Sequence, residues 1–260
     1  MKCVFLGTGY SITSARRHNT SLFLQKGATG LLIDCNGLCV PRLGAAGFAF
    51  EDLEHVFLTH EHIDHIGALA NLMQQIWLKS SYYRPENRRT APINFYGNER
   101  TLKMVQAVFA ALGLPRSPHI FAFNFHTLPD SGGKLAVGDI ALTYFPVRHA
   151  ATPCFGITTR SGSRGLVYSA DTEPLPLLYS QLQAGDILIH ECNSIDAPLN
   201  TGHTTWQQLQ DMLPSLPAVE LYLVHLPHVS DERESAFKAF LKQTYKGHVA
   251  MAEDGLALSV

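Results

Sequence analysis

The chain has 260 residues, of which 46% are hydrophobic and 16% are charged, a balance typical of a globular protein and not of a disordered one. A formal net charge of −2 excludes a global basic field, so a nucleic-acid partner would need a local basic patch. No apolar run approaches the length of a membrane-spanning helix. The apolar start of the chain reaches Gly7 too soon to form a signal peptide. We therefore expect a cytoplasmic protein that does not interact with a membrane.

The five cysteines are scattered along the chain and odd in number, which favours reduced thiols over a disulfide framework. Cys35 and Cys39 are four residues apart, but no second cysteine pair is present to complete a structural zinc site. Buried free thiols and half of a zinc site both remain open for this pair.

Short β-branched and aromatic runs alternate with segments of helical length, and neither a repeat nor a linker divides the chain. We predict one domain over residues 1–260. Strands are predicted at Lys2–Leu6, Ser21–Gln25, Gly30–Asp34, His55–Thr59, Ile93–Tyr96, Ile140–Pro146, Phe155–Thr159, Gly165–Ser169, Asp186–His190, Leu221–Val224 and His248–Ala252. Helices are predicted at Ile66–Lys79, Glu99–Leu112, Thr204–Leu213 and Asp231–Thr244. Such sheets, covered by helices, indicate a layered α/β fold.

The polar segment Lys79–Pro92 interrupts this alternation. It carries three arginines beside Tyr82 and Tyr83, and the basic character continues to Lys103. One interpretation is a solvated loop. The other is a substrate-facing flap that offers cations to phosphate and aromatic rings to bases.

The stretch "VFLTHEHIDHIGAL" places a dense polar cluster directly after a predicted strand. His60, His62, Asp64 and His65 fall in the turn that leaves this strand, where neighbouring side chains can converge on one point. Imidazoles with a carboxylate suit zinc, manganese or iron. The intervening Glu61 and Ile63 are expected to point away.

More candidate ligands follow later apolar runs, and each should therefore reach the same sheet edge as the first cluster. These residues are His149, Asp171, His190, Glu191, His225 and His228. Among them, His190 is expected to give structural support and His228 to lie at the rim of the site. The histidines predicted to have no special role are His18, His55, His119, His126 and His248.

The ordered set of histidines and aspartates resembles that of the metallo-β-lactamase fold superfamily over essentially the whole chain. Within that superfamily the sequence is similar to the ribonuclease Z branch. The residues that carry this second resemblance are Phe5–Gly9, Ser169–Thr172, His190–Glu191 and Gly202–Thr205.

The resemblance implies a four-layer αββα sandwich with two divalent metal ions at one edge. It also implies a homodimer and no other stable protein partner. Zinc is the expected metal, with manganese or iron as alternatives. The implied ligands of one metal are His60, His62 and His149, those of the other are Asp64, His65 and His225, and Asp171 bridges the two.

Such a centre would use a metal-bridging hydroxide to attack phosphorus, with Asp64 orienting it. His203, which resembles the histidine of a branch motif, is the candidate general acid. Its alternative role is that of a histidine at a helix start, with Thr204 or Thr205 as the cap. Glu191 could orient either His203 or a metal-bound histidine.

The chain departs from ribonuclease Z between His149 and Asp171, where that branch commonly inserts a long arm that grips transfer RNA. Here the two positions are 22 residues apart, which leaves room for two strands and a turn. We therefore expect a metal-dependent phosphodiesterase acting on a small or cyclic phosphodiester, or on an RNA 3′ end. The alternatives are a thioesterase or lactonase with the same metal centre, and a non-catalytic metal or nucleotide sensor.

Overall fold

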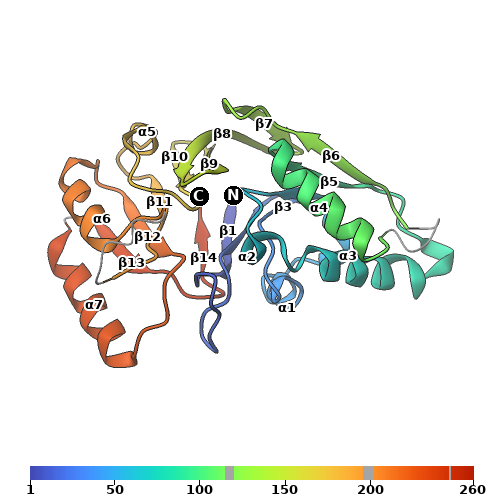
Figure 1. The fold of residues 1–260 in the computed structure, drawn as a ribbon, viewed down its shortest axis with the longest axis horizontal. Helices are drawn as coiled ribbons and strands as arrows, with labels where there is room; N and C mark the ends of the chain where they lie inside the picture. Colours follow the sequence, from blue (N-terminus) through green and yellow to red (C-terminus); the bar gives the residue numbers. More distant parts are fainter. Residues whose placement is uncertain (115–119, 196–201, 246) are drawn as a thin grey trace.

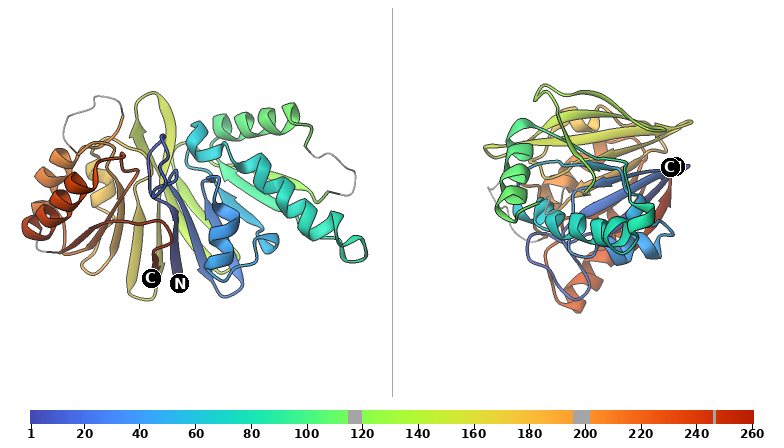
Figure 2. Two further views of the ribbon diagram at one scale, coloured as in Figure 1. Left: turned by 90° about the horizontal axis from the view of Figure 1, so that it is seen from below. Right: turned by 90° about the vertical axis from the view of Figure 1, so that its right-hand side faces the viewer.

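The computed structural model describes residues 1–114, 120–195, 202–245 and 247–260. Two seven-stranded sheets face each other in the middle of the molecule, and helices cover the outer face of each (Figure 1). The two further views show the same layering, with one group of helices outside each sheet (Figure 2). The expected four-layer αββα sandwich is therefore confirmed.

The first sheet contains the first six strands and the last one, and the second sheet contains the remaining seven. In spatial order the first sheet consists of β14 (Ala257–Ser259), β1 (Lys2–Gly7), β2 (Ser21–Lys26), β3 (Thr29–Ile33), β4 (His55–Phe57), β5 (Ile93–Gly97) and β6 (Phe123–Thr127). The second consists of β13 (His248–Met251), β12 (Glu220–Val224), β11 (Ile187–Glu191), β10 (Arg164–Tyr168), β9 (Thr152–Ser161), β8 (Ile140–His149) and β7 (Gly133–Val137).

Strand side chains alternate between two apolar cores, as the two-residue period of a strand requires. In β1, Cys3 and Phe5 enter the core between the sheets, while Val4 and Leu6 face the helices. In β12, Tyr222 and Val224 enter the same central core, whereas Leu221 and Leu223 pack under the other helical layer. Both faces of the central strands of each sheet are therefore buried, which explains why strands such as β1 and β12 are continuous apolar runs.

The helices complete the outer layers. Those over the first sheet are α1 (Cys39–Ala45), α3 (Leu69–Trp77) and α4 (Glu99–Ala111), with the short α2 (Ile63–Ile66) before α3. Those over the second sheet are α5 (Pro176–Tyr179), α6 (Trp206–Met212) and α7 (Asp231–Thr244). Among the described residues, no helix combines the length and apolar character needed to cross a bilayer.

Each sheet contains both antiparallel strands and parallel strands. Strands β3, β4, β5 and β6 run parallel in the first sheet, and β10, β11, β12 and β13 run parallel in the second. The carboxyl ends of parallel strands meet at one edge of a sheet. Residues that follow β4, β10, β11 and β12 are thereby brought together.

Several predicted elements differ from the observed ones. The single helix predicted at Ile66–Lys79 is split, because α2 ends at Ile66 and α3 begins at Leu69. The sequence interpretation missed β6, β7, β14, α1 and α5, all of which are short. Part of the predicted Lys79–Pro92 loop is helical, since a π-helical turn at Leu78–Tyr82 continues α3 and a 3-10 turn follows at Pro85–Asn87.

Phe57 tests how strongly the central core holds the two sheets together. Its ring is fully buried. The ring centroid lies 6.4 Å from that of Tyr144 and 6.5 Å from that of Phe155, both in the second sheet. We expect Phe57→Ala to lower the free energy of unfolding in urea by about 3–5 kcal/mol, the usual range for a buried phenylalanine. Met104→Ala, at a side chain 45% exposed on α4, is the control and should change it little. Similar losses for the two variants would contradict this packing.

Candidate metal centre

Four of the predicted ligands lie where the chain turns sharply from β4 into α2: His60 and His62 in the loop, and Asp64 and His65 in the helix. His62 has extended backbone angles (φ −62°, ψ 146°) as the N-cap of this helix, and Ile63 begins it. The two intervening side chains point away from the cluster, as expected. Ile63 is 74% exposed to solvent, and Glu61 pairs with Arg100 on α4.

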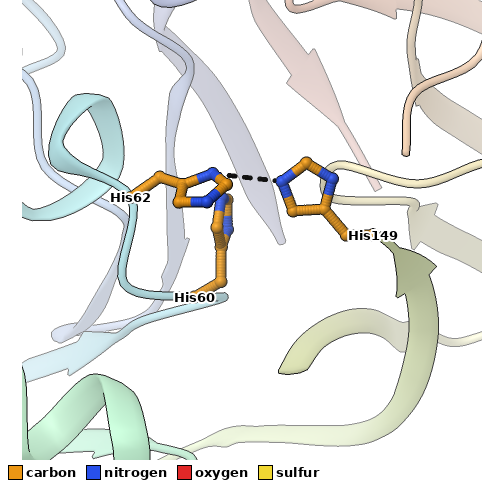
Figure 3. Close-up of side chains that lie close together, drawn as sticks. All are labelled: His60, His62 and His149. Atoms are coloured by element: carbon orange, nitrogen blue, oxygen red, sulfur yellow. Dashed lines mark hydrogen bonds between the residues drawn. The ribbon is translucent and has the colours of Figure 1, made fainter. Parts of the chain in front are cut away.

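His60, His62 and His149 form the first group, in which the ligand atoms lie within 4.8 Å of one another. His60 and His62 approach from the loop after β4, and His149 approaches from the end of β8 (Figure 3). His62 Nδ1 lies 3.1 Å from His149 Nε2. Two nitrogens bound to one zinc ion at roughly 2.0–2.1 Å lie about 3.3 Å apart at the tetrahedral angle, so this spacing suits a shared metal.

A hydrogen bond on the side of the ring away from the cluster fixes the orientation of His149. Its Nδ1 donates to the carbonyl oxygen of Gly202 at 2.8 Å, which leaves Nε2 free toward the cluster. Gly202 has φ +81°, and a Cβ there would lie 2.5 Å from the backbone nitrogen of Ala150. This position therefore requires glycine.

Asp64, His65 and His225 form the second group, again with ligand atoms within 4.8 Å of one another. Asp64 Oδ2 lies 3.5 Å from His65 Nε2 and 3.4 Å from His225 Nε2. This group combines two residues of the short helix α2 with one that follows β12. The structure therefore brings together both predicted ligand sets.

Asp171, which follows β10, lies between the two groups. Its Oδ2 is 3.2 Å from His225 Nε2, 3.4 Å from His65 Nε2 and 3.8 Å from His60 Nε2. Burial by itself would raise the pKa of this carboxyl, but the surrounding imidazoles of His225, His65 and His60 outweigh burial and hold the pKa well below its usual range. A carboxylate placed in this way lies within reach of residues of both groups.

Asp34, directly after β3, is a site residue that the sequence interpretation missed. Its buried carboxylate accepts a hydrogen bond from His65 Nδ1 at 2.8 Å and two more from the backbone nitrogen and hydroxyl of Thr59. A carboxylate on the outer nitrogen of a metal-binding histidine fixes the ring and its tautomer. The sequence contains the same signal for Asp34 as for the predicted ligands, because Asp34 also follows an apolar run. The predicted strand Gly30–Asp34, however, includes Asp34 as its last residue.

Strained backbone is concentrated around this cluster. Four non-glycine residues have positive φ in the described part of the chain: Asp34 (57°), Ala150 (47°), Ala170 (51°) and His225 (55°). Each is one of the site residues above or the sequence neighbour of one. The left-handed conformation costs roughly 1–2 kcal/mol for such residues, and strain of this kind is typical of functional sites.

His203 lies beside the cluster and pairs with Glu191. Its Nδ1 is 2.8 Å from Glu191 Oε1 and 4.0 Å from Asp171 Oδ2. Burial lowers the pKa of His203, but the hydrogen bond and charge of Glu191 and the charge of Asp171 outweigh it, so the pKa is raised. The N-cap of α6 is Thr205, in a capping box with Gln208, as the alternative interpretation expected. His203 lies two residues before this cap.

The donor set fits divalent metal ions. Within the part of the chain that the structure describes, His60 Nε2, His65 Nε2 and Asp171 Oδ1 are buried without a hydrogen-bond partner. Unsatisfied buried polar atoms are costly, and a metal ion would satisfy them. Burial, followed by the charge of His65, also holds the pKa of His60 well below its usual value, which favours the neutral imidazole that binds metals.

The remaining candidates lie outside the cluster. His190 Nε2 contacts the Tyr179 hydroxyl at 3.1 Å, which agrees with a supporting role, and His228 is exposed. His119 lies outside the described residues. Cys35 and Cys39 are buried free thiols.

The arginines of the Lys79–Pro92 segment occupy a different part of the molecule. Arg84, Arg88 and Arg89 line a cavity of about 930 Å³ beside Gly30 and His55, at the starts of β3 and β4. The metal cluster lies beyond the ends of these strands. The segment therefore does not lie over the metal cluster of its own chain, because α3 carries it to the opposite edge of the sheet. Its interpretation as a substrate-facing flap stays a prediction.

Comparison with known proteins agrees with this architecture. A family model described as "Anti-Pycsar protein Apyc1" matches residues 1–246. The chain is 26% identical to the probable metallo-hydrolase YhfI of Bacillus subtilis, over 98% of both chains. The crystal structure of YhfI, a metallo-β-lactamase fold protein, superposes with a TM-score of 0.78 and 23% identity over 99% of this chain and 98% of YhfI.

Two further comparisons point to the ribonuclease Z branch. The chain is 30% identical over 161 residues to ribonuclease Z of Bradyrhizobium diazoefficiens, a match that covers 62% of this chain and half of that enzyme's length. Short-form human tRNase Z superposes with a TM-score of 0.74 and 21% identity, over 100% of this chain and 99% of that one. The predicted resemblance to the metallo-β-lactamase fold and its ribonuclease Z-like branch is confirmed.

Asp34 offers a test of the cluster as a metal centre. We expect Asp34→Asn to weaken zinc binding about 10- to 100-fold, the usual effect of losing an outer partner of a metal ligand, as measured by competition with a chromogenic chelator. Asp186→Asn is the matched control, since Asp186 is equally buried but pairs with Arg160. Unchanged affinity in Asp34→Asn, or an equal loss in the control, would contradict this role.

Proposed function

The chain belongs to the family of the anti-Pycsar protein Apyc1, and from this premise we propose that it is a two-metal phosphodiesterase acting on small or cyclic phosphodiesters. The observation that supports this proposal best is the position of the His203–Glu191 pair, 4.0 Å from the carboxylate of Asp171. Two sets of metal ligands and a paired histidine beside them are the groups that hydrolysis of a phosphate ester requires.

The proposed ligands of one metal are His60, His62 and His149, and those of the other are Asp64, His65 and His225, with Asp171 shared. Zinc, manganese and iron all suit this donor set. Bound in such a site, a pair of these ions polarises phosphoryl oxygens and lowers the pKa of water so that hydroxide forms near neutral pH. Asp64 Oδ2 faces the space between His65 and His225, from which it can orient the attacking water.

We assign the role of general acid to His203. Glu191 accepts the Nδ1 proton of His203 in a hydrogen bond and is itself held by the backbone nitrogens of Thr172 and Asn193. Nε2 is then the atom that can deliver a proton to a leaving alkoxide. A buried carboxylate as partner favours the protonated imidazole, as this role demands.

A small substrate is favoured by what surrounds the centre. The residues between His149 and Asp171 form the strands β9 and β10 and their connecting turns, which leaves no arm to grip a folded RNA. The arginines at positions 84, 88 and 89 lie at the opposite edge of the first sheet. The names of the relatives, a metallo-hydrolase and ribonuclease Z, support hydrolysis of phosphodiesters, while the short β9–β10 hairpin favours substrates smaller than transfer RNA.

The leaving group provides a sharp test of His203. Hydrolysis of a 3′,5′-cyclic nucleotide releases a ribose oxygen as an alkoxide, which needs a proton. Hydrolysis of bis-p-nitrophenyl phosphate releases p-nitrophenolate, which is stable without one. We expect His203→Ala to lower kcat about 10²- to 10⁴-fold on the cyclic nucleotide, with a much smaller loss on the nitrophenyl ester and an unchanged metal content. His228→Ala, at an exposed histidine outside the cluster, is the control.

Other outcomes would point to other substrates. Equal losses on the two esters would remove His203 from the role of general acid. Turnover of a glutathione thioester alone, unaffected by His203→Ala, would replace the phosphodiesterase proposal with a thioesterase. Cleavage of RNA 3′ ends without turnover of cyclic nucleotides would reject the small substrate.

The proposed ligand set is tested separately by metal analysis. We expect Asp171→Ala to reduce bound zinc from two equivalents to one or none, and Asp64→Ala to reduce it from two to one, because each removes an anionic oxygen from the cluster. Activity should fall with the metal content. If both variants kept full metal content and full activity, the assignment of these aspartates as ligands would be wrong.

A further inference from the structure

Glu61 lies between the proposed ligands His60 and His62, yet its carboxylate is turned away from them and toward the first turn of α4. We propose that Glu61, Asn98, Arg100 and Thr101 form a clamp, called here the α4 clamp, that sets the geometry of the metal site of His60, His62 and His149 and not of the other. The inference rests on the two-metal centre proposed above and assigns positioning residues to one half of it.

The first arm of the α4 clamp is the contact of Glu61 with α4. Glu61 is 8% exposed, and its Oε1 lies 2.7 Å from Arg100 Nε. Its Oε2 accepts a hydrogen bond from Thr101 Oγ1 at 3.4 Å. A carboxylate at the first turn of a helix is also favoured by the helix dipole. The segment between His60 and His62 is thereby held to α4.

The second arm is Asn98, the N-cap of α4. Its Oδ1 accepts from the backbone nitrogen of Thr101 at 2.8 Å, and its Nδ2 donates to the carbonyl oxygen of Pro153 at 3.0 Å. Pro153 is the second residue of β9, whose first residue, Thr152, pairs with His149 across the β8–β9 ladder. The same helical turn therefore contacts both segments that carry the three histidines.

Thr152 adds a direct link between these segments. Its Oγ1 lies 3.4 Å from His62 Nε2, the nitrogen of His62 that is turned away from His149. The distance between His62 Nδ1 and His149 Nε2 thus depends on how the loop after β4 is placed against the start of β9. The α4 clamp fixes that placement.

The second metal site is held by other residues. His65 is oriented by Asp34, and the backbone nitrogen of His225 donates to Thr20 Oγ1 at 3.1 Å. Neither contact involves α4. A change in the α4 clamp should therefore affect one site selectively, which a general loss of stability would not do.

The ion pair is also poorly suited to a purely stabilising role. The side chain of Arg100 is 60% exposed, and an ion pair with one partner in solvent contributes little to stability. Glu61→Gln keeps the shape of the side chain but removes its charge. We expect this variant to unfold near the wild-type temperature when free of metal.

The experiment is a zinc titration of the full chain against a chromogenic chelator. His149→Ala and His225→Ala first identify which of the two binding steps belongs to which site. We expect Glu61→Gln and Arg100→Ala each to weaken the step that His149→Ala abolishes by about 10-fold, the lower end of the range for outer partners of metal ligands. The step that His225→Ala abolishes should be unchanged.

Two further variants sharpen the result. Lys103→Ala is the matched control, because Lys103 forms an exposed ion pair with Glu99 on the same helix, at 2.7 Å. The double variant Glu61→Gln with Arg100→Ala should lose no more affinity than either single variant, since residues that act as one unit are not additive.

The outcomes separate this inference from the proposed function. Equal weakening of both steps, or no weakening of either, would overturn the α4 clamp. A wild-type chain that binds a single equivalent would overturn the two-metal proposal instead. The α4 clamp would then stand only if that equivalent were lost in His149→Ala and weakened in Glu61→Gln.

Discussion

The constraint on which the centre depends is the burial of one carboxylate. Asp171 is 2% exposed, and a buried charge is tolerated only where partners compensate for it. Histidines from four separate segments surround it, and five of their nitrogens lie at 3.2 to 4.0 Å from its Oδ2, in His60, His65, His149, His203 and His225. Because each histidine reaches Asp171 from a strand end or from the segment that follows it, the strands of both sheets must end at one level.

This arrangement requires local backbone strain, and the packing of the two sheets holds the strained residues in place. The left-handed residues Ala170 and His225 follow β10 and β12, strands whose side chains are buried on both faces. Their backbone is tied on either side, for instance by the hydrogen bond from His225 to Thr20. The packed core thus fixes the positions of the ligand atoms, which isolated loops would not do. A metal centre requires such pre-organisation.

The sequence was most informative where chemistry and periodicity coincide. Ligands such as His149 and His225 could be predicted because each follows a long apolar run, and the family resemblance divided them between two sites. The strand β6 (FNFHT) was missed because its side chains are largely exposed and its pattern resembles that of a loop. The partner of Glu61 was invisible, since Arg100 is 39 positions away and only the packing of α4 brings it near.

The ligands are divided between the two sheets in a way that bears on folding. Each proposed site takes two residues from the segment after β4 of the first sheet, which is the loop for one site and α2 for the other. Its third residue, His149 or His225, comes from the second sheet. A metal ion would therefore act as a cross-link, and neither sheet alone could bind it well. Affinity would arise only after the sheets dock, late in the folding of a topology rich in non-local strand pairs. Metal should then slow the unfolding of the native chain while leaving its folding rate nearly unchanged.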